Sequence, residues 1–522
     1  MPLINAKLIQ GVFSEAQKKQ IVSQLVDAMV SIEGENMRPV TWVVVEEAQS
    51  GDWAISGKPL TTADVKAFPA ARAVAAAQCC QSHLADDSEG IAVNRHAVRA
   101  RFGARSQLMG VRAPDHVAAE AFDHALEGFL RAVGDPLAHI EPTLLAHPDF
   151  VMGHVLRAST AVAAKDPNAL PILHSALGAI EASGVEPTEQ ERAHLAATRA
   201  WLHGQPELTA LCYTAILRRW PRDLLALRLA QSCHFFLGRR PALREVAELV
   251  WPAWTAGMPG YEYLLAMTAF GCAENGDYDR GEALGREALA MQPVFPFAIH
   301  AVAHALDGRA GFAQGALFMQ QHRPHWARDS RMAAHNAWHA AMFELESGHP
   351  ARALDILDES LMPHATRSAS DAADATALLW QLEVDGVDPG RRWSLLSDCW
   401  AMHAAPGYWP FLDLHAAIAF SAAGHTPRAQ SLARAISACA RRQAGSARAA
   451  RVVTLSALRA IEAFAAGAYA EVRDILRGIQ PALERIGGSH AQHELFRRMF
   501  TEAGRRLRTP NLVECSVWGV AA

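Results

Sequence analysis

The chain has 522 residues and a formal net charge of −5, with half of its residues hydrophobic and a fifth charged. This length is too great for a single hydrophobic core, so we expect more than one domain. The small negative charge argues against binding to nucleic acid or to a membrane surface. No apolar run is long enough to span a bilayer, no signal peptide is recognisable, and the eight cysteines form no CxxC motif. We therefore expect a reduced protein of the cytoplasm.

The first 67 residues have the pattern of a strand, a helix and a second strand. Residues 2–9 are rich in β-branched and alternating apolar side chains. Ser14 and Gln17 then form a capping box at the start of a helix, with Gly34 as a plausible end. Residues 39–47, PVTWVVVEE, predict another strand. Such a βαβ unit is too small to bury a good core alone, so we expect it to associate with copies of itself as a homo-oligomer.

Residues 68–112 show weak periodicity and mixed charge, and we interpret them as a linker that is partly helical or disordered. From residue 113 to residue 522, helical patterns follow one another almost without interruption. Turn glycines recur between them at Gly238, Gly276, Gly308, Gly348, Gly424 and Gly467. Helix-turn-helix units at this period are typical of tetratricopeptide repeats, which stack into a solenoid. The predicted fold is thus mainly α, a helical solenoid preceded by a small α+β domain.

Pro2 is a candidate catalytic residue because Met1 is normally removed before a small second residue. The mature chain then begins with a secondary amine, whose ordinary pKa lies near 8 and falls further on burial. A neutral amine at pH 7 is a good general base for moving a proton next to a carbonyl. The alternative is that Pro2 only starts a strand.

The stretches MPLINAKLIQGVFSEAQKKQIV and TWVVVEEAQSGDWAISG resemble the 4-oxalocrotonate tautomerase family over residues 2–67. This resemblance implies that Pro2 acts as the base on a small carbonyl or enol substrate, without a cofactor, in an oligomeric assembly. It also places Trp53 in the wall of the site. Two arginines that hold a dicarboxylate in well-studied members are replaced by Val12 and Trp42, and Arg38 is the nearest cation in the sequence. We therefore assign Trp53, Trp42 and Arg38 as candidate substrate-binding residues.

Two histidine pairs, in HAVAH at 300–304 and HNAWH at 335–339, mark the helical region. Histidines four residues apart share one face of a helix, and the two pairs are offset by 35 residues, about one repeat. In equivalent registers, four imidazoles would meet and could hold Zn, Fe, Mn or Ni. Against this, the pairs lie at different distances from Gly308 and Gly348, and a chain with 24 histidines contains such pairs by chance.

The same segment resembles the tetratricopeptide-repeat protein 38 family, whose members share an "HxVAH … HNxWH" core. The likeness covers residues 113–510 and includes DFVMGH, RAHLAA, DLHAAIAFSAAG and RIGGSHAQHELF. Asp307 stands where relatives often carry a glutamate. The resemblance implies a set of polar residues on inner helices that would converge on one pocket if the solenoid curls tightly. We assign the metal-ligand candidates as His300, His304, His335, His339 and His415, and the supporting residues as Asp307, Asn336, Asp413, His154, His194 and Gln492.

Three functional hypotheses follow from these patterns. The first is a tautomerase or isomerase that depends on Pro2, and the second is a metal-dependent or acid–base enzyme centred on the HxxxH pairs. Both act on a small molecule, and fusion would link two steps on one substrate. The third is a non-catalytic scaffold that the tautomerase fold oligomerises and that binds a protein partner in the groove of the solenoid.

Overall fold

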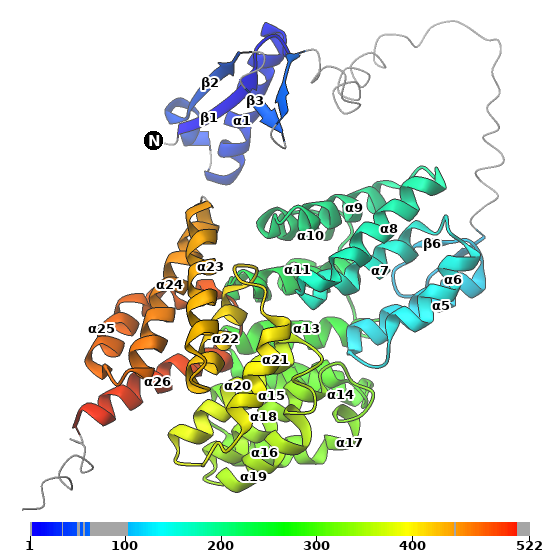
Figure 1. Cartoon of the computed structure of the whole chain (residues 1–522). Coiled ribbons are helices and arrows are strands. Elements are labelled where there is room, and N and C mark those ends of the chain that lie inside the picture. The colour runs from blue at the N-terminus through cyan, green and yellow to red at the C-terminus, as the bar shows by residue number, and fades with distance from the viewer. Residues whose placement is uncertain are drawn as a thin grey trace, which may run out of the picture. The chain divides into compact units, whose positions relative to one another are not determined.

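A computed structural model describes residues 3–33, 35–49, 53–55, 58–62, 103–442 and 445–508. The chain divides into two compact units, Met1–Arg95 and His96–Ala522. The labelled strands β1, β2 and β3 belong to the first unit, whereas the second unit is built almost wholly of helices (Figure 1).

The N-terminal unit contains the predicted βαβ arrangement. Strand β1 (Leu3–Ile9) is followed by helix α1 (Glu15–Glu33), a 3₁₀ turn (Glu35–Val40) and strand β2 (Trp42–Ala48). The two strands are parallel, with Leu3 opposite Trp42. The capping box is present, because the backbone amide of Gln17 donates to the Ser14 hydroxyl and the Ser14 amide donates to the Gln17 side chain. A short hairpin of β3 (Trp53–Ile55) and β4 (Lys58–Leu60) follows.

One face of the parallel pair is covered by α1, which contacts β2. Side chains on the alternate positions of β2 reach solvent: Trp42 is 60% exposed and Val44 is 41% exposed. An exposed apolar face of this kind on a small sheet fits the expectation that the unit associates with other copies.

The second unit is a succession of antiparallel helices, which confirms the predicted mainly α fold with solenoid-like packing. Its longer helices are α5 (His116–Arg131), α6 (Pro136–Ala146), α7 (Val151–Ala164), α8 (Leu170–Ser183), α9 (Glu189–Leu202), α10 (Pro206–Arg219), α11 (Leu224–Phe236), α12 (Arg240–Val250), α13 (Tyr261–Glu274), α14 (Tyr278–Met291), α15 (Pro296–Gly308), α16 (Phe312–Gln321), α18 (Ala333–Glu346), α19 (Pro350–Ile356), α20 (Ala369–Val384), α21 (Arg392–His403), α22 (Pro410–Ala422), α23 (Thr426–Arg442), α24 (Gly445–Ala465), α25 (Tyr469–Ile479) and α26 (His490–Arg508). Shorter segments are α17 (Arg323–Trp326) and single turns at Pro167–Ala169, Trp251–Ala253, Leu357–Leu361 and Gln480–Ile486.

This unit begins earlier than the predicted boundary at residue 113. Strands β5 (Ala104–Arg105) and β6 (Arg112–Ala113) form a small hairpin that contacts α5. Ala104 and Ala113 are buried, so the end of the expected linker belongs to the helical core. Residues 68–102 of that linker lie outside the described residues.

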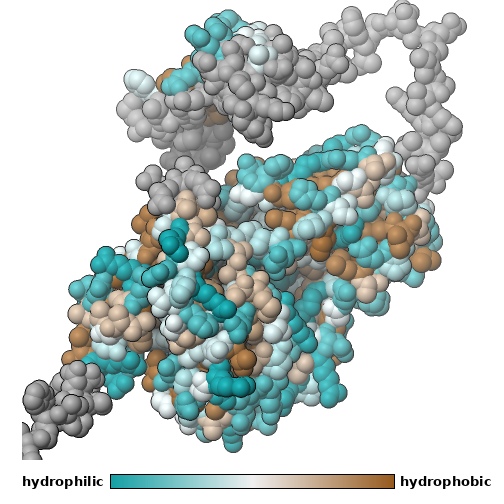
Figure 2. Space-filling view, viewed as in Figure 1, coloured by the Kyte–Doolittle hydropathy of each residue, from teal (hydrophilic) through white to brown (hydrophobic). Residues whose placement is uncertain are grey.

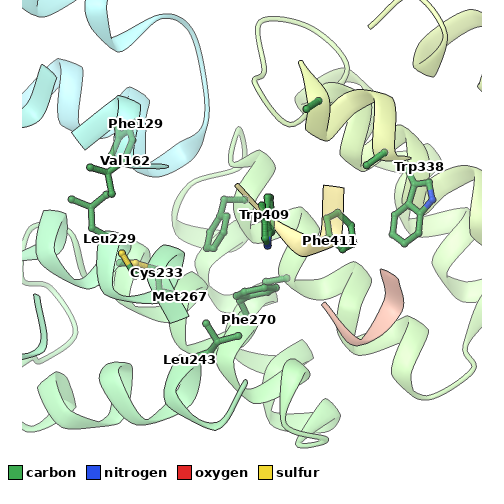
Figure 3. Packing of buried hydrophobic residues seen from close by; sticks show 14 of the residues in the cluster. Phe129, Val162, Leu229, Cys233, Leu243, Met267, Phe270, Trp338, Trp409 and Phe411 are labelled. Atoms are coloured by element: carbon green, nitrogen blue, oxygen red, sulfur yellow. The ribbon is translucent and has the colours of Figure 1, made fainter. Parts of the chain in front are cut away.

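The helices curl until segments far apart in sequence meet. The loop after α5 pairs with the loop before α18, where the amide of Arg331 donates to the carbonyl of Ala132 at 3.0 Å. The last of the described helices, α26, returns to contact α15 and α20 (Figure 1). A nearly continuous core of alanine, leucine and aromatic side chains fills the interior (Figure 3). The tight curl places inner helices from many repeats around one centre.

The surface of this unit mixes polar and apolar side chains (Figure 2). Several large apolar residues are exposed on its first helices, among them Val117, Leu145, Leu208 and Leu211. None of the helices in the described part of the chain is long and apolar enough to span a membrane.

Candidate metal centre and adjoining cavity

Four imidazoles meet between α15 and α18. Nε2 of His300 lies 2.8 Å from Nε2 of His304 and 3.1 Å from Nε2 of His335. The ring centroid of His339 lies 4.6 Å from that of His304. One nitrogen from each of the four rings lies within 4.8 Å of one nitrogen of every other ring. The structure therefore brings together all four members of the two predicted pairs.

The register difference seen in the sequence falls from five residues to three because the first turn does not use Gly308. Gly308 is the last residue of α15, and Ala310 instead adopts the left-handed conformation, with φ of 56°. Measured from Ala310, the first pair lies ten and six residues before the turn, whereas the second pair lies 13 and nine residues before Gly348. The remaining difference of three residues is just under one helical turn, so both pairs face the same side.

Two carboxylates lie behind two of these rings. Nδ1 of His335 lies 2.8 Å from Oδ2 of Asp374 on α20. Nδ1 of His304 lies 2.9 Å from Oε1 of Glu274, the last residue of α13. Asp374 accepts a proton from Nδ1 of His335, so Nε2 of that ring presents its lone pair to the cluster. Nδ1 of His304 lies close to Glu274 but makes no hydrogen bond to it among the described residues. Carboxylates placed behind imidazoles in this way are typical of metal ligands.

A cation bound between the four imidazoles would satisfy nitrogen lone pairs that have no hydrogen-bond donor. Nε2 of His300 faces Nε2 of both His304 and His335, and a single proton on Nε2 of His300 can serve only one of them. Within the described chain, Nε2 of His339 has no hydrogen-bond partner although it is buried. Ligands around tetrahedral zinc are roughly 3.4 Å apart, as follows from Zn–N bonds of about 2.0–2.1 Å. The two separations given above, 2.8 Å and 3.1 Å, are shorter than that value by about 0.6 Å and 0.3 Å.

Aromatic side chains enclose the imidazoles. Trp338 stacks on His335 at 5.5 Å between ring centroids, with 14° between the ring planes. Phe270 contacts His300 and His304, at 5.2 Å in both cases. Figure 3 shows Phe270 and Trp338 approaching from different helices. These rings exclude water from most of the cluster, so any charge inside it is weakly screened.

Burial keeps most of the cluster neutral. It lowers the pKa of His300 and His339 well below the ordinary value, and the neighbouring imidazoles act in the same direction. Burial also lowers the pKa of His304, against the opposing effect of Glu274. For His335, burial acts to lower the pKa, but the charge of Asp374 and its hydrogen bond leave it raised. Neutral imidazole is the form that binds a metal.

A second histidine shares the carboxylate of Glu274. Nδ1 of His490, the first residue of α26, lies 2.7 Å from Oε1 of Glu274, and its Nε2 lies 3.6 Å from Asp307. Burial acts to lower the pKa of His490, but the two carboxylates raise it to about 10. His490 is therefore a cation that ties α26 to α13 and sits directly behind the cluster. The candidate residue Asp307 lies in this outer layer, next to His490.

Two other candidate residues, Gln492 and Asn336, form hydrogen bonds with helices that hold the histidine centre or its carboxylates. Gln492 donates to Oδ1 of Asp374 at 3.3 Å. Asn336 donates to the carbonyl of Pro296 at 3.2 Å, which aligns the start of α18 with the start of α15.

The remaining predicted residues lie elsewhere. His415 is hydrogen-bonded to the carbonyl of Phe411 and is not one of the four histidines that meet. Asp413 lies 3.5 Å from Arg451 and accepts from the amide of Gly407.

His154 and His194 also bond to groups of their own neighbourhood. His154 bonds to the carbonyl of Pro148, and His194 pairs with buried Asp223 at 2.8 Å. These residues recur on inner helices because such helices are buried, and buried polar groups need local partners.

The candidate residues of the N-terminal unit are only partly described. Pro2 lies outside the described residues, and of Trp53 the structure gives only its place at the start of β3. Trp42 begins β2 with its side chain largely exposed. Arg38 pairs with Asp27 and Glu35, each at 2.7 Å. Both carboxylates raise the pKa of this guanidinium, so Arg38 stays charged. In the single chain its positive charge is already balanced by Asp27 and Glu35.

Sequence reasoning did not single out Glu274, Asp374 or His490. Glu274 directly precedes the AENGD turn, and His490 lies inside the RIGGSHAQHELF motif. A carboxylate at the end of the inner helix that precedes the first HxxxH helix was the available signal. No sequence signal pointed to Asp374, because its neighbourhood resembles any other alanine-rich helix.

A cavity of about 340 Å³ opens beside the histidine centre. His300, His335 and Asp374 form part of its lining, together with Lys165, Arg228 and several aromatic side chains. The centre is therefore reachable by a small molecule.

Together these features define a two-part protein, a small βαβ unit joined to a helical unit with a polar centre. Residues 2–63 match the family model described as "Tautomerase enzyme". The N-terminal unit is thus a tautomerase-family domain, which supports a tautomerase-type function for this part of the chain.

Proposed function

We propose that the N-terminal domain is an isomerase that uses Pro2, exposed by removal of Met1, as its general base. The proposal is supported by the family match, which begins at residue 2. The parallel pairing of β1 with β2 is the frame that would position the terminal amine, with Trp42 opposite Leu3. We place Trp42 and Trp53 in the wall of this site, in a homo-oligomer.

The substrate of this domain is proposed to lack a second carboxylate. Val12 and Trp42 occupy the positions of the family arginines, and Arg38 is engaged by Asp27 and Glu35. A dicarboxylate would therefore find no free guanidinium among these residues.

Tautomerisation of phenylenolpyruvate by the full chain tests this part. Pro2→Ala replaces the secondary amine with a primary amine, and we expect at least a tenfold loss of kcat/KM with unchanged assembly. Lys19→Gln, which removes an exposed charge on α1, serves as the matched control and should leave kcat/KM within a factor of about three. Full activity in Pro2→Ala would exclude Pro2 as the base.

We further propose that the helical unit holds one divalent metal ion on His300, His304, His335 and His339. The observation that carries this proposal is the meeting of four imidazole nitrogens with Asp374 and Glu274 behind two of the rings. Imidazole ligands suit Zn, Fe and Ni better than Mg or Ca. A metal ion there would polarise a carbonyl or lower the pKa of a bound water. We also propose that this unit is related to the tetratricopeptide-repeat protein 38 family.

Metal content, measured by plasma mass spectrometry on untagged full-length protein, tests the second part. We expect about one equivalent of Zn, Fe, Mn or Ni per chain, lost in the His335→Ala, His339→Ala double variant. The control removes two exposed histidines, His124 and His139, in the same way and should keep the metal. Metal-free protein after growth with all four metals would overturn the metal centre. The four histidines would then be candidates for acid–base chemistry alone.

A protein partner in the groove, the third hypothesis, stays a prediction. No contact within the described residues favours it over the two enzymatic proposals.

A further inference from the structure

The cavity beside the histidine centre contains positive charge that the protein itself does not neutralise. Lys165 Nζ donates to the carbonyl of Ala163 at 2.8 Å and to the hydroxyl of Ser232 at 3.3 Å. The guanidinium of Arg228 lies over the ring of Phe297, at 4.5 Å from its centroid, and its Nε has no hydrogen-bond partner. Among the described residues, neither cation forms an ion pair with a carboxylate.

Two carboxylates also line the cavity, but both are engaged elsewhere. Asp374 accepts from His335 and from Gln492. Asp371 lies at the start of α20, where it accepts a hydrogen bond from the Ser368 hydroxyl. A third cation, Arg331, donates to the carbonyls of Gly128 and Phe129 at the edge of the cavity. The region around Lys165 and Arg228 therefore has a net positive field.

Unpaired cations in a largely enclosed site are costly unless something completes them. Burial lowers the pKa of Lys165 to about 7, and the charge of Arg228 acts in the same direction. Burial likewise lowers the pKa of Arg228 to about 10. An anion between the two side chains would remove this cost.

The rest of the lining is aromatic. Phe235, Phe270, Phe297, Trp409 and Phe411 contribute to the wall. Figure 3 shows Trp409, Phe411 and Phe270 gathered between helices that lie far apart in sequence. Lys165 Nζ lies 5.7 Å from the ring centroid of Phe235 and 5.9 Å from that of Trp409. Rings that line the path from the cations to the histidines suit a flat apolar body.

We propose that this cavity binds a small aromatic carboxylate. Its carboxylate lies between Lys165 and Arg228, its ring lies among the aromatic side chains, and its far end faces His300 and His335. The volume of about 340 Å³ is within the range of small-molecule sites, which starts near 300 Å³. A reaction at the end that faces His300 and His335 would rest on the proposed metal centre. The site for the carboxylate, between Lys165 and Arg228, does not rest on it.

Binding of three probes to the full-length protein, measured by isothermal titration calorimetry at pH 7, tests the proposal. The probes are 3-phenylpropanoate, its uncharged amide 3-phenylpropanamide, and propanoate, which lacks the ring. We expect 3-phenylpropanoate to bind at least tenfold more tightly than either of the others, because only it has both the charge and the ring. Equal binding of the amide, or no binding of 3-phenylpropanoate at millimolar concentration, would overturn the proposal.

Two variants locate the site. Lys165→Met and Arg228→Gln should each weaken 3-phenylpropanoate binding at least tenfold and leave binding of the amide within a factor of three. Arg222→Gln, which removes an exposed charge near the start of α11, is the matched control and should bind like the wild type. Thermal unfolding of each variant identifies any that fail to fold. Wild-type affinity in both folded cavity variants would show that the carboxylate binds elsewhere.

The anion site and the metal centre are separated by repeating the titration on the His335→Ala, His339→Ala variant. Binding of 3-phenylpropanoate there, with no metal found in the wild type, would uphold the anion site and overturn the metal centre. A wild type that contains metal but binds none of the probes would uphold the metal centre and overturn the anion site.

Discussion

Lys165 combines an uncommon backbone conformation with an uncommon charge. It ends α7 in the left-handed region, with φ of 52°. Side chains other than glycine and asparagine adopt this region at a cost, so Lys165 is not an obvious choice for a helix end. The conformation directs the long side chain into the cavity, where a cation is useful. We interpret the residue as one retained for binding at the expense of stability.

This interpretation predicts the pH dependence of stability. The pKa of Lys165 is about 7 in the folded state and 10.5 for an ordinary lysine, so between these values the unfolded chain binds more protons. The stability contributed by this residue is therefore full above pH 10.5 and is lost as the pH falls towards 7. Because cavity water reduces the cost, we expect Lys165→Met to stabilise the protein by roughly 2 kcal/mol at pH 7.

Chemical denaturation at pH 7 and at pH 10.5 measures this difference. The gain of Lys165→Met over the wild type should disappear at the higher pH. A gain that does not change with pH would mean that packing, and not charge, is responsible.

Asp374 provides a second prediction for a single residue. Its carboxylate holds the Nδ1 proton of His335, and the amide of Asp374→Asn would accept that proton less strongly. We expect metal affinity to fall by about 10- to 100-fold in Asp374→Asn, measured by competition with a chromogenic chelator. Asp413→Asn removes an equally buried carboxylate away from the centre and should leave the affinity unchanged. A wild-type affinity in Asp374→Asn would exclude its role in orienting the ligand.

At the scale of elements, the turn after α11 shows how tightly the solenoid closes. Gly238 has φ of 65°, and a Cβ atom there would collide with the carbonyl of Glu484 in the turn before α26. Two segments nearly 250 residues apart thus touch backbone to backbone.

Gly238→Ala should destabilise the protein by roughly 3 kcal/mol, because it combines a strained backbone with a collision that neither segment can relieve. Gly424 has φ of 69° but open space around it, so Gly424→Ala isolates the backbone strain alone, at about 1 kcal/mol. Urea denaturation of both variants measures the difference. Equal losses of stability in Gly238→Ala and Gly424→Ala would mean that the turns at Gly238 and Glu484 separate easily.

Local patterns predicted the elements well but could not predict their meeting. The capping box at Ser14, the β-branched strands and the turn glycines have local causes, and the structure has helices and strands where they indicated. The four-histidine centre was predictable from the HxxxH spacing once both helices were known to face inward. His490, Gln492 and Lys165 join the site only through the curl of the solenoid, which depends on contacts hundreds of residues apart. No short pattern in the sequence encodes such contacts.

At the scale of the molecule, the two units contain separate candidate sites. The metal-ligand candidates, their carboxylates and the cavity all belong to the unit His96–Ala522, whereas Pro2 belongs to Met1–Arg95. We therefore expect a chain that begins at residue 96 to bind metal with the same stoichiometry as the full protein. Its helical content, measured by circular dichroism, should match that expected for this unit. A metal-free but folded product would show that the N-terminal domain contributes to the centre.

The return of α26 to the middle of the solenoid has a consequence for how the protein is made. His490 and Gln492 reach Glu274 and Asp374 from α26, which comes last among the described helices. While the ribosome still holds that helix, Glu274 lacks its cationic partner and the inner wall of the centre is open. The centre is thus completed only after α26 has been made, and a chain that stops before α26 keeps the four histidines but lacks the helix that secures them.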